Sequence, residues 1–194
     1  MARGEQAGES APIDIHAPQA SLFGEVTEES ATAFFDQLRE AEKGDGAITV
    51  EICTVGGDAE VARRIVKEID LLRERLESRP LLCLGKTTVF SAGVTVMAAF
   101  PRVDRFLTRD AMLLIHCRQL EKTMEVSGPM RASRAEVEAL LHQIDCGLRL
   151  EEENFERLVE GSDIEMEELL EKALYNWYVP AEEALRRALV AGIV

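Results

Sequence analysis

The chain has 194 residues, a length that fits a single domain with a substantial core. Its net charge of −14 argues against binding to a phosphate backbone, and its aromatic content of 5% argues against a base-stacking surface, so we expect no nucleic-acid partner. No run is long and apolar enough to span a bilayer, and residues 1–20 lack the apolar block of a signal peptide, so we expect no membrane partner.

Four cysteines, at positions 53, 83, 117 and 146, are spread through the chain with no pair at the spacing of a metal site. Three of them lie in or next to apolar runs that are typical of strands. We therefore expect buried, reduced cysteines and no zinc site. This pattern favours the cytoplasm.

The first residues mix Gly, Ser, Pro, Glu and Ala without periodicity. We expect residues 1–19 to form a flexible tail and residues 20–194 to form one domain. Within that domain, Leu22–Val26 is typical of a short strand, and Thr27 is placed to cap a helix. The apolar residues of this helix recur at helical spacing and are Ala31, Phe34, Phe35 and Leu38.

Two units of strand followed by helix come next. Residues 48–53 alternate with the period of a strand, and Gly56–Gly57 leads into a helix that is apolar on one face. The apolar run Leu81–Leu84 repeats this order, since small residues lead from it to Ser91 and a second apolar run. Repeated units of this kind predict an α/β fold whose parallel strands are joined by crossover helices.

A third strand-like run, Met112–Ile115, ends directly at His116. Active sites of parallel α/β sheets lie at the carboxyl ends of the strands. We therefore expect Gly56–Gly57, Ser91 and His116 to lie along one edge of the sheet.

The C-terminal half is predicted to be mostly helical. A loop is expected over Glu121–Arg131, and the capping boxes Ser133–Glu136 and Ser162–Glu165 predict the starts of a long helix and a shorter one. A final amphipathic helix is expected after Pro180, closed by Gly192.

Ser91 lies at the predicted junction between a strand and a helix. The first N–H groups of a helix have no internal partner and carry the positive end of its dipole, so a negative charge beside Ser91 would be stabilised. The Gly57 and Ala92 N–H groups would give the two donors of an oxyanion hole, with Ser91 as nucleophile and His116 as base. Two alternatives stay open: Ser91 only caps the helix, and His116 is a structural histidine.

Three short segments resemble, in their order and spacing, the signature of the proteolytic subunit of Clp protease, the ClpP family: Val55–Gly57, Phe90–Gly93 and Leu114–His116. Phe23–Val26 is similar to the opening strand and turn of that family, and residues 181–194 are similar to its closing helix and strand. The likeness covers nearly all of the predicted domain.

The resemblance implies a ClpP/crotonase-type fold with repeated β-β-α and βα units, a parallel sheet and a long protruding helix. It implies a serine endopeptidase that hydrolyses short peptides or unfolded polypeptides without a bound cofactor, and homo-oligomeric rings that stack around a chamber. Carried over by position, Ser91 is the nucleophile, His116 the general base and then acid, and Gly57 and Ala92 the oxyanion-hole donors.

The main departure from the family pattern is Asn176, which stands where the triad aspartate is expected. Its amide oxygen would hold the His116 ring but lacks the charge that stabilises an imidazolium. Glu171 and Asp163 are the carboxylates left open as substitutes.

Other departures concern the partners. Glu121–Met130 occupies the place of a substrate-binding strand, and the residues before Leu22 do not resemble the loops that meet the unfolding ATPase. The chain has no Walker motif, so any ATP dependence would come from a separate ATPase.

Two other functions remain open at this stage. The first is a catalytically weak or inactive ring subunit with a structural or regulatory role, which Asn176 favours. The second is acyl-CoA chemistry of the crotonase type, in which two backbone N–H groups hold a thioester enolate. A Ser-His pair is not what that chemistry needs.

Overall fold

The structure is a computed structural model that describes residues 14–125 and 127–194. Residues 1–13 of the predicted tail therefore lie outside the described residues. The end of that tail is attached to the sheet: the Gln19 N–H donates to the Thr49 carbonyl at 2.9 Å, and the Thr49 N–H donates to Gln19 Oε1 at 2.7 Å.

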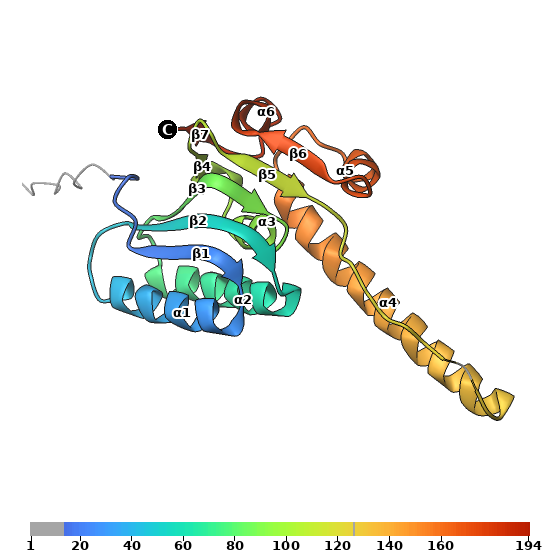
Figure 1. Cartoon of the computed structure of the whole chain (residues 1–194). Helices are drawn as coiled ribbons and strands as arrows, with labels where there is room; N and C mark the ends of the chain where they lie inside the picture. Colours follow the sequence, from blue (N-terminus) through green and yellow to red (C-terminus); the bar gives the residue numbers. More distant parts are fainter. Residues whose placement is uncertain (1–13, 126) are drawn as a thin grey trace, which may run out of the picture.

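Strands and helices alternate through the first half of the chain, and helices dominate the second half (Figure 1). The strands are β1 (Ala20–Val26), β2 (Ile48–Gly57), β3 (Leu81–Phe90), β4 (Arg105–Leu107), β5 (Met112–Ile115), β6 (Trp177–Pro180) and β7 (Gly192–Ile193). The helices are α1 (Glu28–Glu42), α2 (Ala59–Leu76), α3 (Ala92–Met97), the 3-10 turn η1 (Arg102–Asp104), α4 (Met130–Val159), α5 (Met166–Ala173) and α6 (Ala181–Arg186). Among the described residues, no helix is long and apolar enough to cross a membrane.

The sheet is parallel except at one pair of strands. Its main path runs β1-β2-β3-β4-β7, while β5 pairs with β3 in parallel and with β6 in antiparallel. The long strand β3 changes partner along its length, because Cys83–Gly85 pairs with β4 and Thr88–Phe90 pairs with β5. This confirms the predicted α/β fold and brings the ends of β3 and β5 side by side.

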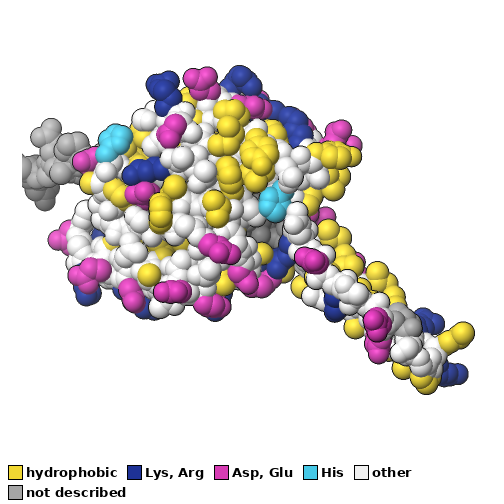
Figure 2. Space-filling view, in the orientation of Figure 1, with side chains coloured by type: hydrophobic (Ala, Val, Ile, Leu, Met, Phe, Trp, Pro, Cys, Tyr) yellow, Lys and Arg dark blue, Asp and Glu magenta, His cyan; other side chains and the backbone are white. Residues whose placement is uncertain are grey.

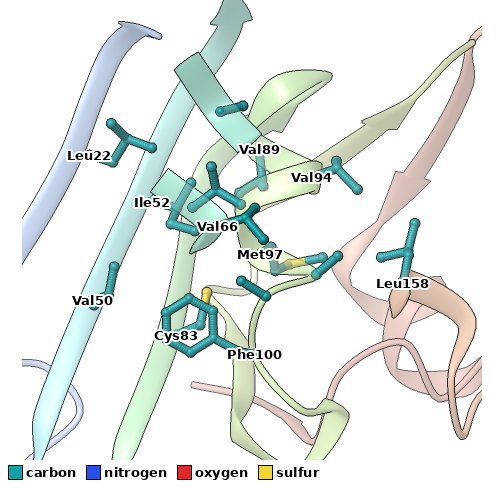
Figure 3. Close-up of a cluster of buried hydrophobic side chains, with 14 of the residues drawn as sticks. Leu22, Val50, Ile52, Val66, Cys83, Val89, Val94, Met97, Phe100 and Leu158 are labelled. Carbon is teal, nitrogen blue, oxygen red and sulfur yellow. The ribbon is translucent and has the colours of Figure 1, made fainter. Parts of the chain in front are cut away.

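Helices α1 and α2 lie together along one side of the sheet (Figure 1). Thr27 forms the predicted N-terminal cap of α1, and Asp58 caps α2 by accepting from the Glu60 and Val61 N–H groups. The core fills the space between strands and helices, where Val50, Cys83 and Met97 are each fully buried (Figure 3). Cys83 is buried as expected, whereas Cys53 and Cys117 are only partly buried and Cys146 is exposed.

Helix α4 leaves the body of the protein as a long arm (Figure 1). It begins at Met130, so the predicted start at Ser133–Glu136 is wrong. Pro129 occupies the N-cap position, and Ser133 already lies inside the helix with its hydroxyl bonded to the Pro129 carbonyl. Proline has no N–H to leave unsatisfied at a helix start, which favours the earlier beginning.

Two further predictions in the C-terminal part are also wrong. Helix α5 begins at Met166, after the Ser162 hydroxyl has accepted from the Ile164 N–H in a local turn. The last helix stops at Arg186 because Ala188 adopts a φ of 53°, and Gly192 then pairs with Phe106 as part of β7.

Arg105, at the start of β4, is the largest fully buried side chain. Its guanidinium donates to five backbone carbonyls, which belong to Ala98, Phe100, Arg157, Leu158 and Leu189. Burial lowers the pKa of Arg105 to about 10. The side chain thereby ties the end of α3 to the end of α4.

Replacing Arg105 with methionine should lower the free energy of unfolding by about 3–5 kcal/mol, because it leaves buried carbonyls without donors. Urea denaturation measures this loss. Arg109→Met is the matched control, since Arg109 is 80% exposed and should change stability by less than about 0.5 kcal/mol. Equal stabilities for the two variants would show that the buried network is not required.

Candidate active site

Ser91 occupies the junction between β3 and α3 in an unusual backbone conformation. Its φ is 52° and its ψ is −114°, and its N–H donates to the Leu114 carbonyl at 2.8 Å. The side chain makes no capping hydrogen bond to α3, so the interpretation of Ser91 as a simple helix cap is wrong. A serine on a strained turn between strand and helix is typical of activated nucleophiles.

Two glycines make room for this turn. A Cβ atom on Gly56 would lie 2.8 Å from Ser91 Cβ and 3.4 Å from Ser91 Oγ. A Cβ atom on Gly93 would lie 2.4 Å from Thr54 Cγ2, so α3 can approach the sheet only with glycine there. Sequence reasoning assigned the functional contact to Gly57, but Gly56 is the glycine that packs against Ser91.

A cavity of about 60 Å³ lies beside Ser91. From the sheet side it is lined by Ser91, Ala92 and His116, and from α4 by Glu151 and Phe155. The cavity walls are completed by Ala59, Val94, Thr95, Ile115, Arg118, Asn154 and Leu158. The structure therefore brings Ser91, Ala92 and His116 together, as expected for the edge of the sheet.

Gly57 is not among the residues that line this cavity. It ends β2 with a φ of 147°, and a Cβ atom there would lie 2.4 Å from the Val26 carbonyl oxygen. Gly57 thus packs against β1, whereas Ala59 and Ser91 line the cavity.

His116 is held by its own neighbour along the chain. Its Nδ1 atom lies 2.7 Å from the Cys117 carbonyl oxygen. A carbonyl only accepts, so this contact requires a proton on Nδ1 and leaves the lone pair of a neutral ring on Nε2. The described residues contain no hydrogen bond from this ring to Ser91. Such bonds are often long before a substrate binds.

Asn176 lies at the next step of the β5–β6 register. Ile115 pairs with Trp177, which places His116 and Asn176 opposite each other just beyond the ladder. Asn176 nevertheless lines a different hollow, together with Glu171 and Tyr175. Within the described part of the chain, no hydrogen bond joins Asn176 to the His116 ring.

The two carboxylates considered as substitutes also lie elsewhere. Asp163 accepts from Arg187 Nε at 2.7 Å, and Glu171 lines the hollow of Asn176 rather than the cavity of His116.

The structure adds two charged residues that sequence reasoning missed, Arg118 and Glu151. Glu151 is only 7% exposed and accepts from the Arg118 backbone N–H. The Arg118 guanidinium pairs with Glu60 and lowers the pKa of that carboxyl. Glu151 shares the inward face of α4 with Phe155 and Leu158, at helical spacing, and this spacing was the signal available in the sequence.

The strained serine and the histidine thus lie at the carboxyl ends of adjacent parallel strands. The architecture, a mostly parallel sheet with the long helix α4, is a ClpP-like α/β fold. The sequence profile of Clp protease matches residues 15–194, and the chain belongs to the Clp protease family. Proteins of this family are typically serine peptidases and form oligomeric rings.

Among solved structures, the chain is similar to an asparagine-to-aspartate mutant of ClpP1 from Listeria monocytogenes, with a TM-score of 0.68 and 21% sequence identity. The likeness covers 93% of this chain and 92% of that one, and at this identity it supports the fold alone. Comparison with curated proteins gives no match.

Ser91→Gly should be more stable than Ser91→Ala by about 1 kcal/mol, because a Cβ atom is strained at a φ of 52° and glycine is not. This corresponds to a rise in melting temperature of about 2–4 °C. Both variants lack the hydroxyl, so differential scanning calorimetry of the pair isolates the backbone effect. Identical melting temperatures would contradict strain at this position.

Proposed function

We propose that this chain is a ClpP-like serine endopeptidase that hydrolyses short peptides or unfolded polypeptides, with residues 20–194 as its peptidase domain. The observation that carries the proposal is that Ser91, on its strained turn, and His116 line one cavity. Family membership supports it, because proteins of the Clp protease family are typically serine peptidases.

In the proposed mechanism, His116 Nε2 accepts the proton of the Ser91 hydroxyl as Oγ attacks the scissile carbonyl. We assign stabilisation of the oxyanion to the N–H of Ala92, which lines the cavity, and to the N–H of Gly57, which lies two residues before the lining residue Ala59. His116 then passes the proton to the leaving amine, and an activated water releases the acyl group from Ser91. This chemistry uses side chains and backbone only and needs no cofactor.

We assign Asn176 to the acid position of the triad. The register that sets it opposite His116 supports this assignment. The amide oxygen of Asn176 accepts from His116 only when the ring turns away from the Cys117 carbonyl; in the orientation that the structure shows, that carbonyl is the acceptor. An amide supplies orientation without negative charge, so we expect slow acylation.

We also propose that the chain works as a homo-oligomeric ring, with rings stacked through α4. Of the 30 residues in this helix, only Glu151, Phe155 and Leu158 are buried, all in its last third. Farther out, Leu141 and Leu148 are 51% and 49% exposed on the arm, where Figure 2 shows apolar side chains. An exposed apolar stripe of this kind favours packing against a second copy.

The free cysteines bear on the compartment in which the protein works. Cys53, Cys83, Cys117 and Cys146 are free, which favours a reducing compartment, and we propose the cytoplasm. Delivery of folded substrates would need a separate ATPase, because the chain has no Walker motif.

A second function is favoured by one observation, the contact between His116 Nδ1 and the Cys117 carbonyl in place of a contact to Asn176. In this alternative the chain is an inactive or weakly active ring subunit that contributes architecture or regulates an active protease.

Fluorophosphonate labelling separates the two functions. Intact mass of the wild type should show one adduct per chain, and Ser91→Ala should show none, with hydrolysis of a fluorogenic peptide falling by about a thousandfold or more. His116→Gln should slow labelling strongly. An adduct of equal yield in Ser91→Ala, or none on the well-folded wild-type oligomer, would contradict the peptidase proposal.

Asn176→Asp should accelerate labelling of Ser91 by roughly tenfold or more, because a carboxylate facing His116 stabilises the imidazolium formed during acylation. The rate constant of labelling measures the effect. Glu171→Gln serves as the control: it changes the charge of the same hollow and should leave the rate unchanged. Slower labelling of Glu171→Gln, together with an unchanged labelling rate for Asn176→Asp, would assign the acid to Glu171 instead.

A further inference from the structure

The peptide unit between Cys117 and Arg118 is bonded on both sides within the candidate site. Its carbonyl oxygen lies 2.7 Å from His116 Nδ1. Its N–H donates to a carboxylate oxygen of Glu151. One rigid, planar amide therefore connects a buried carboxylate to the imidazole ring.

Glu151 is suited to this position by its burial. It is 7% exposed and lines the same cavity as Ser91 and His116. A buried carboxylate needs hydrogen-bond donors, and the Arg118 guanidinium is directed to Glu60 instead. Burial raises the pKa of the Cys117 thiol, and the negative charge of Glu151 adds to that shift.

We propose that Glu151 is a positioning residue for His116 and acts through the Cys117–Arg118 peptide. The carboxylate fixes the peptide N–H, and the peptide in turn presents its carbonyl oxygen to His116 Nδ1–H. This inference rests on the proposed peptidase function and gives it the negative charge that Asn176 lacks.

The electrostatic effect follows from the order of the groups. A negative charge beside the N–H of an amide polarises the peptide group and increases the negative partial charge on its carbonyl oxygen. The oxygen becomes a stronger hydrogen-bond acceptor, as in hydrogen-bonded chains. The stronger acceptor holds the proton on Nδ1, which leaves Nε2 free to act as base toward Ser91. When His116 takes up a second proton, the same carbonyl and the carboxylate behind it stabilise the imidazolium.

Glu151→Gln keeps an acceptor for the Arg118 N–H but removes the charge, and it should slow fluorophosphonate labelling of Ser91 roughly tenfold. Glu152→Gln is the matched control, because Glu152 is the exposed neighbour on the same helix and should label at the wild-type rate. Circular dichroism and the melting temperature establish that both variants are folded.

A second pair of variants acts on the peptide itself. Arg118→Pro removes the N–H that donates to Glu151, whereas Arg118→Ala removes only the side chain. Arg118→Pro should slow labelling at least as much as Glu151→Gln and clearly more than Arg118→Ala, which keeps the N–H that donates to Glu151. Equal rates for proline and alanine would overturn a role for the peptide N–H.

Nitrogen-15 NMR of histidine-labelled protein gives a readout that does not depend on activity. The chain has three histidines, so the signals of His116 are identified by their loss in His116→Gln. The wild type should carry its ring proton on Nδ1, and Glu151→Gln should move population to the Nε2–H form, while Glu152→Gln should not.

The outcomes separate the positioning role from the peptidase function. An unlabelled wild type with a tautomer that responds to Glu151→Gln would defeat the peptidase proposal and leave the positioning role standing. If the wild type is labelled but Glu151→Gln changes neither the His116 tautomer nor the labelling rate, the positioning role is overturned and the peptidase proposal stands.

Discussion

The hydrogen bond from the Ser91 N–H to the Leu114 carbonyl is the contact on which the site depends. It continues the pairing of β3 with β5 by one residue, past Phe90 and Leu114, into the turn that carries the serine. Because His116 follows two residues after Leu114, this bond sets the separation of the two groups. It also helps hold Ser91 at its positive φ, which a free chain would avoid.

Two buried charges support this arrangement from opposite ends of α3. Arg105 binds the carbonyls at the carboxyl end of α3 and those near the end of α4, so the two helices are fixed relative to each other. Glu151, two turns earlier on α4, then meets the strand extension beyond His116. The hydrogen bonds of both charges are directional and end on fixed backbone groups, so they favour one alignment of α4 with the sheet.

The sequence was sufficient to predict which strands deliver Ser91 and His116 to one edge of the sheet. It was not sufficient to predict which side chains of the C-terminal half face them. Strand periodicity located β2, an apolar run located β5, and the order of strand and helix predicted that Ser91 and His116 would meet. Strand β6 has four residues, too few for a period, and forms because β5 offers it a partner. Glu151 begins a run of three glutamates that reads as a solvated face, and only packing against the sheet selects the first of them for burial.

The proposed role of Glu151 gives a reason why the site would tolerate an amide at position 176. The His116 Nδ1–H can be given to the Cys117 carbonyl or to residue 176, but not to both at once, since the proton has a single direction. A carboxylate at 176 would win that competition by its charge. With Asn176 the two acceptors are both neutral, and the carbonyl backed by Glu151 holds the ring. The side chain at 176 therefore selects between two orientations of one histidine, each with its own source of negative charge.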